Sequence, residues 1–371
     1  MVKQVEQWTE IRAADFIEFN PRMSIKKGTI ATKVAMDKLQ PFTKKIPDSE
    51  KASFSGGSKF RNGDTIMARI TPCLENGKTA FVDILGKAEV AFGSTEFIVM
   101  RAREGISDPQ FIYYLATSPW FRNIAIKSMV GSSGRQRVQQ SVLDDLVLNV
   151  PPLEEQKKIS SFLCVLDQKI ALNNEINDNL QQQAQAIYAS MFVDNADPTW
   201  QQGHLSDLVT VRYGKDHKKL ADGIYPVYGS GGIMRHVERP LYDKESVLIP
   251  RKGTLNNVMY VNQPFWSVDT MFYTEMRLPD VAKFVYHFVK AKDLAAMNAG
   301  SAVPSMTTDI LNAMEIAIPP ATVLEEFESL VAPMYRAMQG NDAQSKKLAD
   351  LRNALLPKLM SGEIDVSDIQ L

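Results

Sequence analysis

LVLNVPPLEEQKKI, at residues 146–159, and MEIAIPPATVLEEF, at residues 314–327, are two versions of one pattern. Their double prolines lie 168 residues apart, and at the same offset apolar residues stay matched as far as Met191 and Leu359. Self-similarity at a fixed offset is typical of a repeated architecture. The sequence therefore predicts two related halves, each ending in the same kind of segment.

The front of each half is repeated as well. Trp8 with Asp15-Phe16-Ile17 matches Trp200 with Asp207-Leu208-Val209 at an offset of 192, so the second globular block is 24 residues shorter. Short β-like runs bounded by turn residues occur at 63–70, 78–85, 95–100, 246–251 and 257–261. One helical patch follows in each block, at 109–121 and 282–297. Regular βαβ alternation is missing, so we predict an α+β fold with two tandem mixed α/β domains.

A long helix is predicted after each Pro-Pro pair, because proline can end an extended segment but does not fit inside a helix. Ten residues spaced three and four apart follow Pro152, and eight of them are apolar, which is typical of a narrow coiled-coil seam. A helix of roughly 35 residues is about 50 Å long and needs a partner. We therefore expect the two helices to pair as an antiparallel coiled coil with pseudo-two-fold symmetry. The residues predicted to make this pairing are Leu166, Ile170, Asn173, Leu180, Ile187, Met334, Met338, Asn341, Leu348 and Leu355.

Two features of these helices carry further expectations. Asn173 and Asn341 occupy the same mid-seam position and would fix the register if the helices pair, whereas exposure to solvent is the alternative. Pro333 is expected to kink, delay or interrupt the second helix.

The predicted elements divide the chain into four segments of different charge. Residues 1–150 hold 21 Lys+Arg and 16 Asp+Glu, and the helical region 151–195 holds 3 and 6. Residues 196–318 hold 13 of each, and the helical region 319–371 holds 5 and 8. Neutral or basic globular blocks thus alternate with acidic helices, as expected if only the globular blocks face a polyanion.

Composition excludes several classes of protein. The chain has 371 residues, 44% hydrophobic and 23% charged, which is the range of a globular protein with two or more domains. Cys73 and Cys164 form no C-x-x-C motif, so neither a disulfide framework nor a zinc site is expected. Because the sequence has no signal peptide and no run of eighteen apolar residues, we predict a soluble cytoplasmic protein without a membrane segment.

Catalytic motifs are missing from the sequence. It contains no G-x-x-x-x-G-K-[ST], no G-x-G-x-x-G and no G-x-S-x-G, and its four histidines are not spaced as metal ligands. Asn20-Pro21 is followed by Arg22, not by the proline and aromatic residue with which an amino-methyltransferase holds a flipped base. We therefore expect no catalytic residue, no metal and no cofactor in this chain.

Residues suited to DNA binding gather in loops of both blocks. Phosphates are bound by Lys, Arg and hydroxyl groups, whereas Arg, Asn and Gln read base edges. Arg135, Gln136 and Arg137 are the sharpest base-reading candidates, although any one of these residues could be an ordinary solvated turn residue. The predicted DNA-binding set is Lys26, Lys27, Lys59, Arg61, Arg69, Ser132, Ser133, Arg135, Gln136, Arg137, Arg212, Tyr213, Lys215, Ser230, Arg235, Arg251, Lys252, Thr254 and Ser301. Arg69 and Arg251 are stronger candidates for DNA binding than the others, because each lies at the end of a β-like run in its own half.

The chain resembles a type I restriction-modification DNA specificity subunit along its whole length. The resemblance rests on the two-copy layout, on LNVPPLEEQKKI (148–159), on YPVYGSGG (225–232) with IPRKGT (249–254), and on RNALLPKLMSGEI (352–364). The second junction departs from the first, since Thr322-Val323-Leu324 replaces Glu154-Glu155-Gln156, so the two partner-docking surfaces are expected to be unequal. No base-contacting residue is carried over from the family.

The resemblance implies a non-catalytic subunit that reads a bipartite target in double-stranded DNA. Residues 1–150 and 196–318 would be target-recognition domains 1 and 2, and residues 151–195 and 319–371 would be helical spacer regions. It also implies docking of two modification subunits, which bind S-adenosylmethionine and methylate adenine, and of motor-nuclease restriction subunits.

Two other classes of function stay open. An enzyme, such as a fused methyltransferase or nuclease or a small-molecule transferase, would show turnover by the isolated chain. A structural scaffold would space protein partners without retaining DNA, whereas DNA retention that weakens steeply with salt would favour the recognition subunit.

Overall fold

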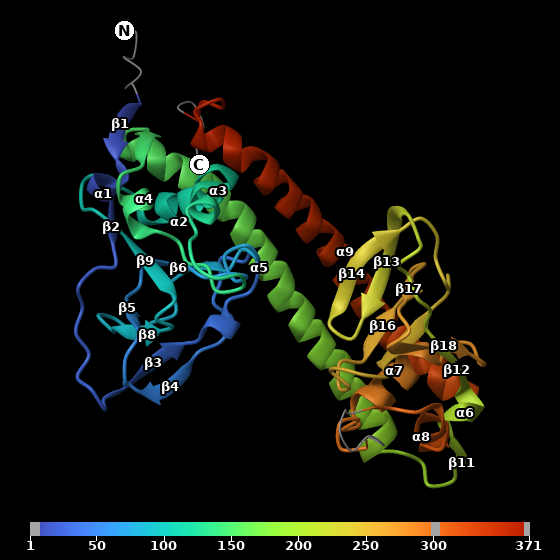
Figure 1. The fold of residues 1–371 in the computed structure, drawn as a ribbon. Helices are drawn as coiled ribbons and strands as arrows, with labels where there is room; N and C mark the ends of the chain where they lie inside the picture. The colour runs from blue at the N-terminus through green and yellow to red at the C-terminus, as the bar shows by residue number, and fades with distance from the viewer. Residues whose placement is uncertain (1–7, 298–304, 367–371) are drawn as a thin grey trace. The chain divides into compact units, whose positions relative to one another are not determined.

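The computed structural model describes residues 8–297 and 305–366 (Figure 1). These residues form two compact units. The first unit contains residues 8–175 and 341–366, and the second contains 176–297 and 305–340. Each unit therefore includes one part of each of two long helices, α5 (Leu153–Ala189) and α9 (Ala321–Met360). The mixed α/β fold with two tandem globular blocks and two long helices is as predicted.

In the first unit, two four-stranded sheets form the globular block. Their strand orders are β2-β9-β6-β7 and β4-β3-β8-β5, and a β1-β10 pair joins the two ends of the block. All pairings are antiparallel except β3 with β8. The strands are β1 (Thr9–Arg12), β2 (Ile17–Phe19), β3 (Ile30–Val34), β4 (Glu50–Ser53), β5 (Ser58–Phe60), β6 (Thr65–Ala68), β7 (Thr79–Phe81), β8 (Ala91–Gly93), β9 (Phe97–Ala102) and β10 (Val147–Val150).

Short helices accompany these sheets. They are α1 (Ala13–Phe16), the 3-10 turn η1 (Met36–Lys38), α2 (Pro109–Thr117), α3 (Pro119–Lys127) and α4 (Gln140–Asp144). One of them, α2, packs against strands β6, β7 and β9 of the β2-β9-β6-β7 sheet. The single helical patch predicted at 109–121 is divided at Ser118, whose backbone is extended and whose hydroxyl caps α3. Phe16, Phe111 and Phe121 are fully buried between these helices and the sheet.

The second unit repeats this arrangement with fewer strands. Its sheets have the orders β12-β18-β15-β16 and β14-β13-β17, and a β11-β19 pair joins the ends of the block. The strands are β11 (Gln201–His204), β12 (Val209–Tyr213), β13 (Asp222–Gly229), β14 (Gly232–Val237), β15 (Ser246–Pro250), β16 (Met259–Val261), β17 (Trp266–Ser267), β18 (Met271–Met276) and β19 (Glu315–Ile318). The helices are the π-helical turn η2 (Ser190–Asp194), α6 (Leu205–Leu208), α7 (Ala282–Lys290) and α8 (Thr308–Asn312).

The two units agree in topology, which confirms the repeat seen in the sequence. The strand order β2-β9-β6-β7 corresponds to β12-β18-β15-β16, and the parallel pair β3·β8 corresponds to β13·β17. Helices α1 and α6 begin at Ala13 and Leu205, at the predicted offset of 192, and α5 and α9 begin at Leu153 and Ala321, at the offset of 168.

The long helices pair antiparallel within each unit, as predicted. In the first unit, Asp167 of α5 contacts Arg352 of α9, and Asn173 donates a hydrogen bond of 3.1 Å to Ser345 Oγ. Asn173 is fully buried, and its amide nitrogen also lies 3.4 Å from the Asn341 carbonyl oxygen. The eight apolar residues that the sequence analysis assigned to the pairing are all half-buried.

Pro333 does not delay or interrupt the second helix, so that part of the expectation was wrong. Helix α9 runs through it without a break. Proline removes one intrahelical hydrogen bond, to the carbonyl of Ser329, but both residues are exposed, so water can bind that carbonyl. Burial of Val331 and Tyr335 on either side of the proline holds the helix against the second unit.

In the second unit, a buried histidine joins α7 to both long helices. His287 is fully buried, its Nδ1 lies 2.8 Å from Gln185 Oε1, and its Nε2 lies 3.0 Å from the Tyr335 hydroxyl. Its ring stacks on that of Tyr188, with centroids 5.4 Å apart. Burial lowers the pKa of His287 from 6.5 to about 4, so the imidazole is neutral at pH 7.

The second unit should lose stability as the pH falls through this range. Because the folded pKa of His287 lies below the unfolded one, the unfolded chain binds more protons between pH 6.5 and 4. We expect the free energy of unfolding at pH 5 to be about 2 kcal/mol lower than at pH 7. Urea titrations of the wild type and of His287→Phe measure this difference, and an equal pH dependence in both proteins would contradict it.

Candidate nucleic-acid interface

Two predicted arginines occupy equivalent positions in the two units. Arg69 follows strand β6 and Arg251 follows the corresponding strand β15. Their backbone N–H groups donate to the carbonyl oxygens of Glu96 and Thr270, and their own carbonyl oxygens accept from later segments at Val138 and Met306. The same backbone framework therefore holds one arginine at the same strand end in each unit.

Arg69 lines a polar groove of the first unit. The groove has a volume of about 500 Å³, and Arg22 and Lys59 also line it. No aspartate or glutamate is among the described residues that line it. The Arg69 guanidinium donates from Nη2 to the Val138 carbonyl oxygen at 3.2 Å, while its buried Nε has no hydrogen-bond partner. A groove lined by cations without a carboxylate suits an anionic group such as phosphate.

Arg22 was not among the residues predicted for this interface. In the sequence it stands out only because it breaks a methyltransferase motif. The groove wall formed by Asn20–Met23 is fixed because the Asn20 side chain accepts from the Val99 N–H group at 3.0 Å. Since this contact joins residues 79 positions apart, the local sequence carries no signal for it.

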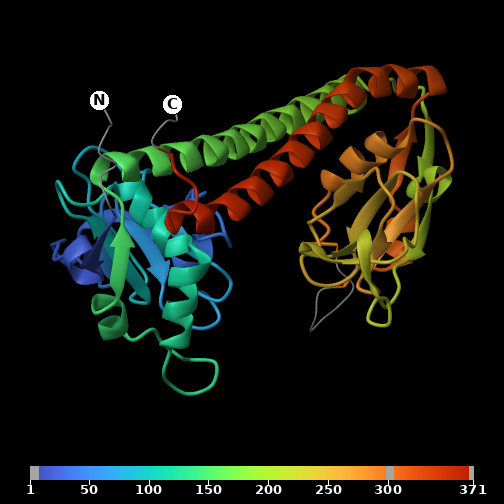
Figure 2. The ribbon, with the colours of Figure 1, turned by 90° about the horizontal axis from the view of Figure 1, so that it is seen from above.

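The predicted loop at residues 131–137 lies next to Arg69. Thr71 and Gln136 exchange hydrogen bonds, and a turn joins Ser132 to Arg135. Figure 2 shows this loop on the side of the first unit that is turned away from α5. The loop therefore presents Ser132, Ser133 and Arg135 to solvent.

Arg137 differs from its neighbours because its charge is already paired. Its guanidinium forms a two-pronged ion pair with the Glu96 carboxylate, with Nη2 2.7 Å from Oε1. Four other predicted cations of this unit, Lys26, Lys27, Lys59 and Arg61, make no ion pair within the described part of the chain. Lys59 Nζ instead lies 5.2 Å from the centroid of the Phe54 ring.

In the second unit, several predicted residues meet at one end of the sheets. The Arg251 guanidinium lies over the ring of Tyr213, 5.5 Å from its centroid, and donates to the Asp269 carbonyl oxygen at 3.3 Å. Ser230 lies against the following loop, since Asn257 Nδ2 donates to its carbonyl oxygen at 2.8 Å. Lys215, Lys252 and Thr254 are exposed.

Two predicted arginines of this unit are held by carboxylates. Arg212 pairs with Glu275 at 3.1 Å, and Arg235 pairs with Asp222 at 2.7 Å. Ser301 lies outside the described residues.

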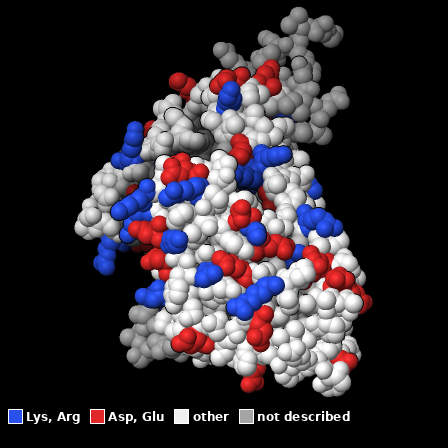
Figure 3. All heavy atoms as spheres, turned by 90° about the vertical axis from the view of Figure 1, so that its right-hand side faces the viewer, with Lys and Arg blue, Asp and Glu red and all other residues white. Residues whose placement is uncertain are grey.

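Lysine and arginine do not merge into one large basic patch on the face drawn in Figure 3. Basic and acidic side chains alternate there. That face therefore has no broad positive field that would steer a polyanion towards it. The features that favour DNA binding are local clusters of cations.

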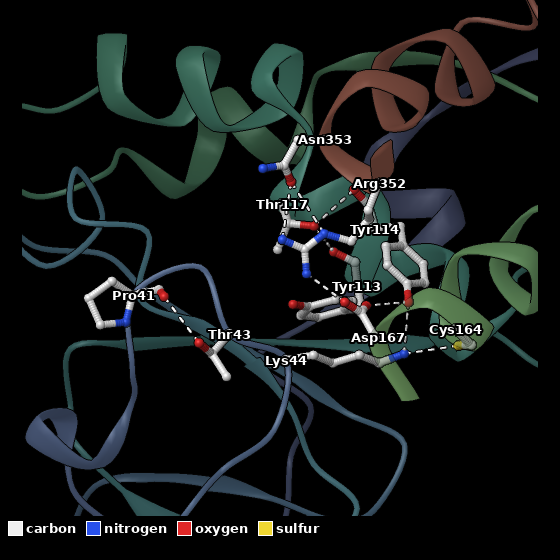
Figure 4. A network of polar contacts seen from close by, with 10 residues as sticks. All are labelled: Pro41, Thr43, Lys44, Tyr113, Tyr114, Thr117, Cys164, Asp167, Arg352 and Asn353. Carbon is white, nitrogen blue, oxygen red and sulfur yellow. Dashed lines mark hydrogen bonds and ion pairs between the residues drawn. The ribbon is translucent and has the colours of Figure 1, made fainter. Parts of the chain in front are cut away.

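A buried polar network fixes helix α2 to both long helices in the first unit (Figure 4). The Tyr114 hydroxyl donates to Asp167 Oδ2 at 2.6 Å, and Arg352 Nη1 donates to Asp167 Oδ1 at 2.5 Å. Lys44 completes the network by contacting the Tyr114 hydroxyl at 3.2 Å and Cys164 Sγ at 2.9 Å. Burial and the Asp167 charge hold the pKa of Tyr114 well above its usual value, so this hydroxyl stays protonated. No pattern in the sequence predicted this network.

Residues 8–297 and 305–366 contain no group of three or more His, Cys, Asp or Glu side chains placed to hold a metal ion. None of their helices is both long enough and apolar enough to cross a lipid bilayer.

Comparison with known proteins gives matches over most of the chain. The sequence profile of the family described as "Type I restriction modification DNA specificity domain" matches residues 6–182 and 198–325. The specificity subunit of the type I restriction enzyme HindI from Haemophilus influenzae is 22% identical over 416 residues, which cover 82% of this chain and 87% of that protein. The specificity subunit of the type I restriction enzyme MjaIX from Methanocaldococcus jannaschii is 23% identical over 304 residues, or 70% of each chain.

A solved structure shares the fold. The S subunit of a type I restriction-modification system from M. genitalium superposes with a TM-score of 0.59 at 16% identity, covering 97% of each chain.

Proposed function

Because this chain belongs to the family of type I restriction modification DNA specificity domains, we propose that it reads a bipartite target in double-stranded DNA. Residues 1–150 act as the first target-recognition domain and residues 196–318 as the second. Each domain recognises one half-site, and the lengths of α5 and α9 set the number of base pairs between the half-sites.

The observation that carries this proposal is the pair of equivalent arginines, Arg69 and Arg251. Arginine is the side chain that most often reads guanine, and its fork of donors also suits phosphate. The strand end that holds it is the same in both units, whereas the surrounding loops differ in length and sequence. Such a repeated frame with unequal loops is what two similar readers of different half-sites require.

In this proposal the chain is the non-catalytic member of a larger assembly. The regions 151–195 and 319–371 dock two modification subunits, which bind S-adenosylmethionine and methylate adenine, and motor-nuclease restriction subunits join them. A scaffold that only spaces proteins is less well supported, because it does not explain why the cations Arg22, Lys59 and Arg69 gather in the polar groove.

Methylation mapping tests the proposal directly. Long-read sequencing is applied to cells that express the chain with its modification subunit and to cells that lack only this chain. We expect a bipartite methylated-adenine motif that disappears with the chain. Exchange of residues 1–150 for another recognition domain should change one half of the motif and leave the other half unchanged. An unaltered methylation pattern beside a verified active modification subunit would refute the proposal.

A further inference from the structure

The hairpin β13–β14 of the second unit carries a β-bulge near its tip. Gly229 pairs with Gly232 and Tyr228 with Ile233, but the next pair joins Val227 to Arg235. Met234 is therefore an extra residue on strand β14. A bulge re-aims a side chain and often occurs beside a functional site.

Both residues at this bulge are apolar and exposed. Ile233 is 54% exposed and Met234 is 62% exposed. Strand β14 is also the edge of its sheet, which has the order β14-β13-β17 (Figure 1). Edge strands are usually protected by charged residues or proline, because exposed apolar edges invite aggregation. We therefore expect the surface of a binding partner to cover these two side chains.

The surroundings of the hairpin tip indicate the nature of that surface. Asn257 holds the tip through the Ser230 carbonyl oxygen, and a Cβ atom added at Gly253 would lie 2.6 Å from Ser230 Oγ. The glycine is needed at this close approach, where its φ is also +84°. The tip therefore lies against the loop that carries Arg251 and Lys252, so apolar side chains and cations occupy neighbouring parts of one unit.

DNA offers a matching combination of groups. Its major groove is wide enough for a two-stranded β-ribbon, its walls are phosphates, and the thymine methyl is the apolar group on its base edges. We propose that Ile233 and Met234 contact thymine methyl groups in the major groove of the second half-site and so determine specificity at A·T pairs there. This inference rests on the proposed DNA-reading function.

Deoxyuridine, which differs from thymidine by the lack of that methyl group, provides the test. Binding is measured for the complex of this chain with its modification subunits and for duplexes that carry the mapped target. Each thymine of the second half-site is replaced in turn by deoxyuridine. We expect binding to weaken about fourfold at one or two positions, as for loss of one buried carbon group. Ile233→Ala and Met234→Ala should abolish this difference between thymidine and deoxyuridine.

Leu278→Ala is the matched control. This leucine is 40% exposed and follows the C-terminal end of strand β18, whereas Arg251 lies near the other end of that strand. The variant should keep the full deoxyuridine effect. Specific binding without any deoxyuridine effect in the second half-site, or a half-site without thymine, would overturn the inference and leave the proposed function standing. Equal binding of the mapped and a scrambled duplex would instead overturn the proposed function and the inference together. Protection of Ile233 and Met234 by a protein subunit without DNA would assign the hairpin to a protein interface.

Discussion

Arg352→Met is expected to lower the free energy of unfolding of the first unit by about 3–5 kcal/mol. The substitution leaves the Asp167 carboxylate in place, and that side chain is only 9% exposed. A buried charge that loses its partner keeps its desolvation cost and no longer receives the compensating attraction. The hydrogen bond from Tyr114 remains, but a neutral hydroxyl cannot replace a guanidinium. Urea unfolding of the purified chain at pH 7, followed by fluorescence, measures the change.

The double variant Asp167→Leu/Arg352→Met separates charge from packing. It should regain most of the lost stability, because neither member of the Asp167–Arg352 ion pair is then left buried without the other. The second unit supports this expectation, since Tyr335 and Ala184 occupy the positions that correspond to Asp167 and Arg352 at the offset of 168. Both are buried there without an ion pair between them. If the double variant is as unstable as Arg352→Met, the loss of stability comes from altered packing at residues 167 and 352 and not from an unpaired charge.

The repeat made much of the fold predictable from the sequence. The Pro-Pro pairs located the starts of α5 and α9 at Leu153 and Ala321, and the front match located α1 and α6. These predictions succeeded because both signals are local and occur twice. The expected break at Pro333 failed because buried neighbours on the same helix outweigh one lost hydrogen bond.

The candidate interface was predictable only in part. Residue type and loop position led to Arg69 and Arg251, since each directly follows an apolar strand. The pairing of Arg137 with Glu96 joins residues 41 positions apart, and the contact of Asp167 with Arg352 spans 185, so neither leaves a local pattern. The exposure of Met234 depends on a strand register shifted by one residue, which alternation of apolar and polar residues does not reveal.

Arg69→Ala is expected to weaken recognition of the first half-site by about 10- to 100-fold, the range for loss of one good base contact. The guanidinium lines the polar groove and makes no ion pair within the described residues, so it can bind an acceptor from DNA without breaking one. Competition binding with duplexes altered in one half-site measures the effect. Arg251→Ala should give the same loss at the second half-site only.

Arg69→Lys distinguishes contact with a base from contact with a phosphate. Lysine keeps the charge but lacks the planar fork of donors that recognises guanine. If Arg69 reads a base, the lysine variant should keep the salt dependence of binding and lose discrimination at one position of the first half-site. If discrimination survives, Arg69 is a phosphate contact, and base reading in the first unit then falls to Arg22 or to the loop with Arg135. Arg12→Ala is the matched control, because this exposed arginine lies outside the polar groove and outside the predicted DNA-binding set, so discrimination at both half-sites should stay unchanged.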